Sequence, residues 1–261
     1  MQKIPARKKL LFFITLITSS FVASAQSGSS AEIEMEGSEG TALTGQVMAS
    51  FDQPWAMTFL PDGHSLVTEK EGVIWLLDKN QQKRFSVDNV PSVTARGQGG
   101  LGDVIIHPEF TTNKTVYVSY IERDPEDDAF SGAVIERATL NITHNSASLS
   151  EREIIWRQSP KVTGNGHYSH RMVFSPDGYL FITSGERQKF TPAQNMAMNL
   201  GKILRLNDDG SVPEDNPFVG NGDVTGQIWT LGHRNPLGID FDAEGNLWAH
   251  EMGPRHGDEL N

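Results

Sequence analysis

Short apolar runs separated by tight turns recur along this chain and set its main pattern. Three segments share the arrangement of an apolar run, a turn at a glycine and a second apolar run: residues 55–69, 171–185 and 237–251, with turns at Gly63, Gly178 and Gly245. Glycine adopts the positive φ that such turns need, and Asp-Gly between alternating apolar runs is a strong hairpin signal. A looser copy runs from Leu101 through His107 to Tyr120. The pattern predicts repeated β-hairpins.

Repetition of one hairpin motif favours a β-propeller over a β-sandwich, whose hairpins have no reason to resemble each other. Helix-period patterns are nearly absent, and the repeats recur at roughly 45–70 residues, which is typical of propeller blades with variable outer hairpins. About four blades can be counted, and the fourth breaks off at Asn261. We therefore expect an all-β propeller that is truncated at its C-terminus, because a propeller closes by pairing its first and last blades.

The first 25 residues have the pattern of a secretory signal peptide. A basic start is followed by an apolar stretch from Leu10 to Val22, and Ala23-Ser-Ala25 supplies small residues for cleavage. The apolar stretch is too short to span a bilayer comfortably. We expect residues 1–25 to be a signal peptide, 26–46 a flexible Ser-, Gly- and Glu-rich leader, and 47–261 the propeller domain. The mature chain is then exported, periplasmic or secreted, with no membrane span.

The composition limits the chemistry and the classes of binding partner that this chain can have. The chain has no cysteine, so it has neither disulfides nor thiolate chemistry, and a bacterial periplasm suits it. Loss of the signal peptide removes four positive charges and takes the formal charge from −11 to −15. Such an acidic surface argues against nucleic acid or anionic membranes as partners. It suits an exported enzyme with a neutral substrate, or a cation-binding protein.

Three polar clusters could carry chemistry. His167 lies among Gly164, Gly166 and Arg171, and histidine is the side chain best suited to general-base work near neutral pH. Glu186 follows the paired strand and could orient that imidazole, although a solvated loop acid is equally consistent with the sequence. Arg234 lies on a turn before Asn235-Pro236, and its planar charged fork suits carboxylates or quinone-like oxygens.

A metal site is suggested by the last cluster. Gly253-Pro254 is followed by Asp258-Glu259, and backbone carbonyls with carboxylates favour calcium over zinc. The chain lacks zinc-type spacing, a phosphate-binding glycine loop before a helix and a lipase-type nucleophile elbow. NAD or ATP chemistry is therefore not expected.

Taken together, these motifs resemble those of the soluble PQQ-dependent aldose/glucose dehydrogenases, the glucose/sorbosone dehydrogenase-like proteins. The matching motifs appear in the family's order across residues 50–261: Gln98-Gly-Gly-Leu-Gly, His107-Pro-Glu-Phe, His167-Tyr-Ser-His-Arg171, Gly201-Lys-Ile-Leu-Arg-Leu-Asn, Asp208-Asp-Gly-Ser-Val-Pro-Glu-Asp-Asn-Pro, Leu231-Gly-His-Arg-Asn-Pro and Glu251-Met-Gly-Pro with Asp258-Glu-Leu-Asn. The resemblance implies a six-bladed propeller with PQQ over its central opening.

The resemblance also implies roles for individual residues. His167 would take the proton from the anomeric hydroxyl of an aldose while hydride passes to PQQ, giving a lactone, and Glu186 would orient His167. The remaining roles follow from the same resemblance: Arg234 and Asn235 on the quinone oxygens, Gln98 on cofactor or substrate, the Gly253 and Pro254 carbonyls on a calcium ion, and Glu259 on a second, structural calcium. An external electron acceptor, a cytochrome or a quinone, would reoxidise the cofactor.

Two positions depart from the family pattern. His170 stands where relatives usually have glycine, and Met252 occupies a cofactor-binding position that is usually Gln or His. The basic residues that bind the PQQ carboxylates come from later blades in this family, beyond Asn261. Two other functions therefore stay open: a non-catalytic exported propeller that binds a saccharide or a protein, and a calcium-dependent lactonase.

Overall fold

The computed structural model describes residues 32–81 and 84–261, which divide into two units between Val47 and Met48. In the first unit, β1 (Glu32–Glu36) and β2 (Ala42–Gln46) form an antiparallel hairpin around Gly40, whose φ is 77°. This hairpin falls within residues 26–46, for which a flexible leader and no strand had been predicted. The predicted signal peptide lies outside the described residues.

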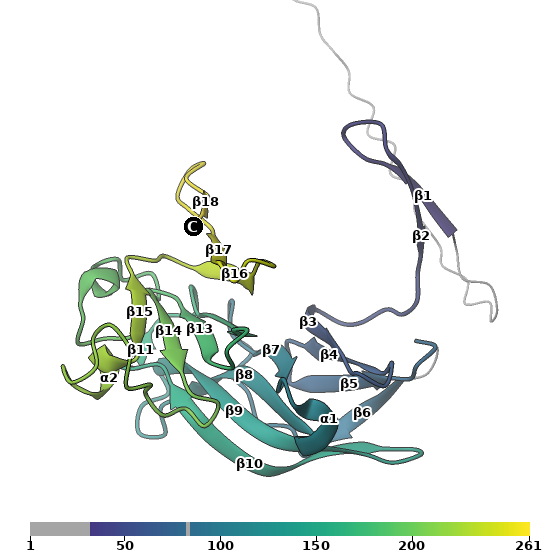
Figure 1. Cartoon of the computed structure of the whole chain (residues 1–261), viewed down its shortest axis with the longest axis horizontal. Coiled ribbons are helices and arrows are strands. Elements are labelled where there is room, and N and C mark those ends of the chain that lie inside the picture. The colour runs from purple at the N-terminus through teal and green to yellow at the C-terminus, as the bar shows by residue number, and fades with distance from the viewer. Residues whose placement is uncertain (1–31, 82–83) are drawn as a thin grey trace, which may run out of the picture. The chain divides into compact units, whose positions relative to one another are not determined.

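The second unit is built from successive, mainly antiparallel sheets (Figure 1). The first sheet holds β3 (Pro54–Phe59), β4 (Ser65–Glu69), β5 (Val73–Leu77) and β6 (Arg84–Asp88). The second holds β7 (Leu101–Ile106), β8 (Thr115–Arg123), β9 (Phe130–Ile142), β10 (Ala147–Arg157) and β11 (Val162–Thr163). The third holds β12 (Ser169–Phe174), β13 (Leu180–Ser184), β14 (Lys202–Leu206) and β15 (Ile228–Leu231), and the fourth β16 (Pro236–Phe241), β17 (Leu247–Glu251) and β18 (Glu259–Leu260).

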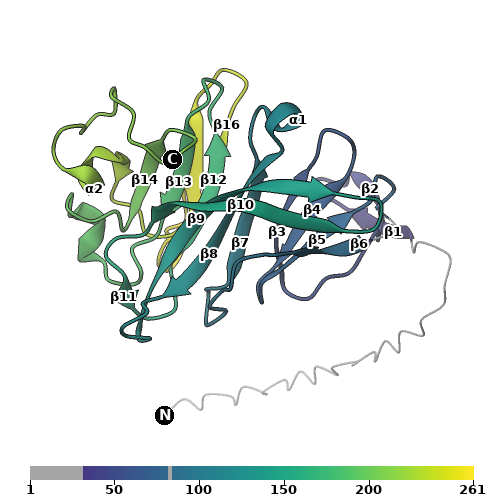
Figure 2. The same cartoon turned by 90° about the horizontal axis from the view of Figure 1, so that it is seen from below.

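The first strand of each sheet lies at the inner edge of the assembly. Strand β3 contacts β7, β7 contacts β12, and β12 contacts β16, so the inner strands of all four sheets follow one another. Figure 2 shows β7, β8 and β9 side by side, with β12 and β13 of the third sheet beyond them. The first two sheets are joined through a short parallel pairing of β6 with β10 at Val87 and Ala147. This is the arrangement of propeller blades.

Apolar clusters fill the spaces between neighbouring sheets. Leu66, Ile74 and Val118 belong to a cluster between the first and second sheets, and Ile135 and Ile182 to one between the second and third. A smaller cluster between the third and fourth sheets contains Phe181, Ile203 and Ala249. Strands β4, β13 and β14 are buried along their whole length. For β13 and β14, the reason is that the third sheet has a neighbouring sheet on each side.

The predicted fold class is confirmed: the chain is all-β, with about four propeller blades. The hairpins β3–β4, β12–β13 and β16–β17 turn at Gly63, Gly178 and Gly245, with φ of 93°, 90° and 84°. The helical segments of the described ranges are one turn each: α1 (Phe110–Asn113), η1 (Thr191–Gln194) and α2 (Asp223–Gly226). Within those same ranges, no helix has the length and apolar character needed to cross a membrane.

Candidate functional site

A cavity of about 260 Å³ lies at the centre of the four sheets. Its walls come from every blade: Trp55 in β3, Gln98 before β7, His170 in β12, Leu237 in β16 and Met252 after β17. A larger cavity of about 680 Å³ lies past the opposite end of β3, around Pro61 and Phe110, and contains none of the predicted site residues. The central cavity is therefore the candidate site.

His167 and Glu186 form a buried pair beside this cavity. Nδ1 of His167 hydrogen-bonds Oε1 of Glu186, and both side chains are more than nine-tenths buried. The other carboxylate oxygen accepts the backbone N–H of Phe190. With the carboxylate ionised, the imidazole donates from Nδ1, and its Nε2 keeps a free lone pair. Nε2 has no hydrogen-bond partner among the described residues, so it is available to a substrate proton.

The backbone that carries His167 is unusual. Its φ is 50°, in the left-handed region, and the pairing of β12 with β13 is irregular between Ser169 and Met172. The carbonyl of His167 lies so close to Gly185 that a Cβ there would approach its oxygen to 2.0 Å. Glycine at position 185 is thus a steric requirement of the histidine's position. Such conformations persist only where the surroundings hold them.

Two side chains hold this loop. Oε1 of Gln98 accepts the backbone N–H of His167 at 2.7 Å, which leaves the amide nitrogen of Gln98 for other partners. Arg187 is 1% exposed and donates to the carbonyls of Gly166 at 3.0 Å and Gly164 at 2.6 Å. Its guanidinium also lies 3.7 Å from the ring centre of Tyr168. Burial lowers the pKa of Arg187 to about 10, so the side chain stays charged at neutral pH.

Asn235 lines the cavity, and Arg234 precedes it on the same turn. The backbone N–H of Glu186 donates to the carbonyl of Arg234 at 2.9 Å, which ties this turn to the His167–Glu186 pair. The Arg234 guanidinium donates from Nη1 to the Met252 carbonyl at 2.8 Å, whereas its Nε is buried without a partner in the described part of the chain. Oδ1 of Asn235 accepts from Ser169 at 3.1 Å, so its amide nitrogen remains a donor.

His170 forms part of the cavity floor. Its ring stacks on Trp55, with ring centres 5.0 Å apart, and its Nδ1 lies 2.7 Å from Oγ of Ser119. Burial, and next the charge of Arg171, lowers the pKa of His170 to about 3. A Cβ on Gly102 would lie 2.0 Å from Cε1 of this ring, so the histidine occupies space that a glycine opposite it leaves open. His170 is therefore a neutral aromatic surface and not a second base.

The predicted metal residues lie at the end of the chain's fourth sheet. Gly253 and Pro254 follow Met252 directly, and their carbonyls accept no hydrogen bond from residues 32–81 or 84–261. Glu259 lies exposed in β18, and no side-chain contact joins it to the other site residues in those ranges. Within the described residues, no three His, Cys, Asp or Glu side chains gather as a metal site would require.

Residues that the sequence analysis did not select also shape the site. Glu251 is buried and accepts the backbone N–H groups of both Arg234 and Asn235. Burial by itself raises the pKa of Glu251, but the hydrogen bond from His233 and those from the backbone outweigh it and lower that pKa. Glu251 stood within a recognised motif, but no residue type near it in sequence indicated its partners.

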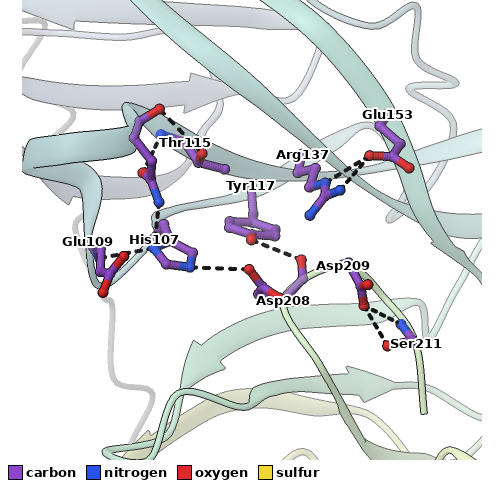
Figure 3. Close-up of polar contacts among 10 residues, drawn as sticks. His107, Glu109, Thr115, Tyr117, Arg137, Glu153, Asp208, Asp209 and Ser211 are labelled. Carbon is purple, nitrogen blue, oxygen red and sulfur yellow. Dashed lines mark hydrogen bonds and ion pairs between the residues drawn. The ribbon is translucent and has the colours of Figure 1, made fainter. Parts of the chain in front are cut away.

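His107 is not among the residues that line the central cavity, and Figure 3 shows its contacts. Strand β7 begins next to the central cavity and ends before His107, whose Nδ1 accepts from the Glu109 N–H and lies 2.9 Å from the Asn113 amide. Its Nε2 faces Asp208 at 3.4 Å, and the hydroxyl of Tyr117 donates to the Asp208 carbonyl at 2.9 Å. These contacts attach the loop after β14 to the second sheet, in keeping with a structural role for His107.

Comparison with known proteins identifies several relatives. The glucose/sorbosone dehydrogenase family profile matches residues 51–261. The aldose sugar dehydrogenase YliI of Escherichia coli is 38% identical over 214 residues, which cover 80% of this chain and 56% of that protein. Quinoprotein glucose dehydrogenase B of Acinetobacter calcoaceticus is 31% identical over 240 residues, which cover 82% of this chain and 49% of that protein. The chain thus spans about half the length of these relatives.

Solved structures show the same likeness. The apo-form of the soluble aldose sugar dehydrogenase from Escherichia coli superposes with a TM-score of 0.75 at 37% identity, over 80% of this chain and 60% of that one. The PQQ-bound aldose sugar dehydrogenase of Streptomyces coelicolor superposes with a TM-score of 0.71 at 28% identity, over 81% of this chain and 60% of that one.

Proposed function

The chain belongs to the glucose/sorbosone dehydrogenase family, and from this premise we propose that it carries the catalytic region of a PQQ-dependent aldose dehydrogenase. The observation that carries the proposal is the buried His167–Glu186 pair beside a central cavity to which all four sheets contribute. Relatives named for sugar oxidation and for PQQ support this choice of reaction. The substrate would be an aldose and the product its lactone.

The donors around the cavity suit a quinone cofactor. Nε of Arg234 is buried without a partner among the described residues, and a buried unpaired donor is costly unless a ligand satisfies it. Asn235 and Gln98 have each committed their oxygen atom, which leaves their amide nitrogens as donors. When bound, PQQ would accept the hydride from the sugar. Arg234 and Asn235 would donate hydrogen bonds to its oxygens and stabilise negative charge there.

The proton route follows from the His167 geometry. The Nε2 lone pair would take the proton of the anomeric hydroxyl as hydride leaves the carbon that bears it, and the C–O bond becomes the lactone carbonyl. Glu186 would hold the ring in this tautomer and balance the charge that the imidazolium gains. The neutral stack of His170 on Trp55 would form the floor of the site without competing for the proton.

The Gly253 and Pro254 carbonyls would hold the calcium ion. They are hard oxygen ligands on a tight loop, where a Cβ on Gly253 would lie 1.6 Å from the carbonyl oxygen of Gly257. Glu259 would serve a second calcium whose other ligands are not among the site residues. We further propose that the protein is exported and that an external cytochrome or quinone takes the electrons.

The test is dye-linked aldose oxidation by the complete protein after addition of PQQ and Ca²⁺. We expect turnover only with both, and a loss of roughly 10²–10⁴-fold in His167→Ala, the usual contribution of a positioned base. Exposed His144, in the turn between β9 and β10, supplies the matched control His144→Ala, which should keep full activity. Full activity in His167→Ala would refute the base assignment. Hydrolysis of lactones with Ca²⁺ alone, or binding of a sugar without turnover, would instead support the lactonase or the binding-protein alternative.

A further inference from the structure

Glu251 is a buried carboxylate that receives hydrogen bonds from three sides. Its Oε2 accepts the backbone N–H groups of Arg234 at 2.6 Å and Asn235 at 3.1 Å. Its Oε1 accepts from Nδ1 of His233 at 2.9 Å and from the side-chain amide of Asn261 at 3.4 Å. A carboxylate with this many donors fixes the backbone around it, because hydrogen bonds to a charged acceptor are shorter and stronger than neutral ones.

The strand register places this carboxylate beside the turn. Glu251 is the last residue of β17 and pairs with Pro236, the first residue of β16, so the residues that precede Pro236 lie directly against its side chain. The proline ring fixes its own φ and biases Asn235 toward an extended backbone. The Arg234–Asn235 segment is therefore held at one end by Pro236 and along its N–H groups by Glu251.

His233 extends the attachment to the third sheet. Its Nε2 lies 2.7 Å from Oγ1 of Thr230 in β15, and its backbone N–H donates to the Gly201 carbonyl at 3.1 Å. The His233 imidazole thus connects Glu251, in the fourth sheet, to Thr230, in the third. His233 and Glu251 form a histidine–carboxylate pair, as His167 and Glu186 do, but here both ring nitrogens have partners. This pair has no free lone pair for catalysis.

The residue after Glu251 completes the connection to the cavity. The carbonyl of Met252 accepts from Nη1 of Arg234, and Gly253 and Pro254 follow immediately. The Met252 side chain offers no polar group, but its backbone orients the guanidinium whose Nε is unpaired in the described part of the chain. The donors proposed for the quinone and the carbonyls proposed for the metal are consequently attached to one short segment.

We propose that Glu251 is a positioning residue that presents Arg234 and Asn235 to the cofactor without touching it. This inference rests on the proposed function for its ligand and on the hydrogen bonds of the apo chain for its geometry. Partners that orient binding groups in this way are usually worth 10–100-fold in affinity or activity. Glu251→Ala should therefore weaken PQQ binding by about that factor.

Three substitutions separate positioning from simple loss of structure. Glu251→Ala removes every acceptor, and Glu251→Asp keeps the charge but withdraws it from the two N–H groups by one methylene. Glu251→Gln offers one acceptor oxygen to the turn, and its amide can donate to His233 once that imidazole changes tautomer and donates to Thr230. The glutamine variant should thus keep Arg234 and Asn235 in nearly their wild-type positions. Thr230→Val, which removes the distant partner of His233, is the matched control.

The first readout is amide hydrogen exchange of Arg234 and Asn235 in the apo protein. Exchange should be at least about tenfold faster in the alanine and aspartate variants, because each amide loses a hydrogen bond to a charged acceptor. It should stay near the wild-type rate in Glu251→Gln and Thr230→Val. The second readout is a PQQ titration in the presence of Ca²⁺, followed by absorbance. The Kd for PQQ should rise 10–100-fold in Glu251→Ala and Glu251→Asp.

The outcomes are distinguishable. Unchanged exchange at both amides in Glu251→Asp would overturn the positioning role, and this variant carries the test if Glu251→Ala does not fold. Faster exchange with an unchanged PQQ affinity would also overturn it, since the turn would then not present the donors. Failure of the complete wild-type protein to bind PQQ would refute the proposed function, while the exchange rates would still report on the geometry.

Discussion

Acid should destabilise the folded chain through His170. This ring is 2% exposed, stacks on Trp55 and lies within hydrogen-bonding distance of Ser119. Burial, and next the charge of Arg171, lowers its pKa from 6.5 to about 3. Between these two values the unfolded chain binds a proton that the folded chain does not. The contribution of the neutral ring to stability is fully present above pH 6.5 and is lost as the pH falls toward 3.

The size of the effect follows from the two pKa values of His170. One extra proton on the unfolded state lowers the free energy of unfolding by about 1.4 kcal/mol for each pH unit below 6.5. At pH 5 the loss amounts to about 2 kcal/mol, a large share of the roughly 5–15 kcal/mol that stabilises a typical domain. Burial also raises the pKa of Asp103, although the charge of Arg171 opposes the shift, so the assay must separate the contributions of the two groups.

Urea unfolding at pH 7 and pH 5 provides that separation. His170→Gln retains a partner for Ser119 but cannot take up a proton, and Asp103 is present in both proteins. We expect wild type to lose about 2 kcal/mol more than the variant between the two pH values. His144→Gln, at an exposed position, is the control and should behave as wild type does. An equal loss in wild type and His170→Gln would refute the reasoning.

Three further substitutions test other parts of the structure. Gly185→Ala should leave the chain folded but lower aldose oxidation on the order of 10²-fold, because the new methyl group would displace the His167 carbonyl; wild-type kcat/KM would contradict this. Arg187→Leu should cost about 3 kcal/mol or more in urea unfolding, since buried carbonyls lose their donor; a loss under about 1 kcal/mol would disprove it. Burial lowers the pKa of Lys202 to about 8 against 10.5, so stability should rise with pH between these values as the unfolded chain alone keeps the proton. Lys202→Met should abolish that rise, and a persisting rise would assign it to another group.

The hairpins could be predicted from sequence because their signals are local. Gly63, Gly178 and Gly245 each sit between two apolar runs, and a turn that needs positive φ restricts the residue type at that position. The parallel pairing of β6 with β10 has no such signal, since the paired residues Val87 and Ala147 are separated in sequence by β7, β8 and β9. The hairpin of residues 32–46 was also missed, because the alternation in Glu32–Glu36 covers only five residues of a segment that is otherwise rich in Ser, Gly and Glu.

The site residues could also be predicted only in part. His167, Glu186 and Arg234 could be selected because they lie at strand ends and turns within recognisable motifs, although a solvated loop acid fitted Glu186 equally well. The structure brings the three residues together. Arg187 and Lys202 could not, because their partners are backbone carbonyls, which every residue has. Lys202 donates to three of them within one loop, at 2.8–3.0 Å, and nothing in the sequence distinguishes it from a solvated lysine.

Several of the contacts that shape the site cross from one sheet to the next. Gln98, before the second sheet, accepts from His167 at the start of the third, and Glu186 and Ser169 of the third bond the Arg234–Asn235 turn before the fourth. The distance between the proposed base and the donors proposed for the quinone therefore depends on how the sheets pack, and the clusters between sheets determine that distance. A cavity-forming change such as Ile182→Ala, between the second and third sheets, should consequently lower activity as well as stability. The packing between the blades therefore sets the geometry of the proposed site as well as the stability of the fold.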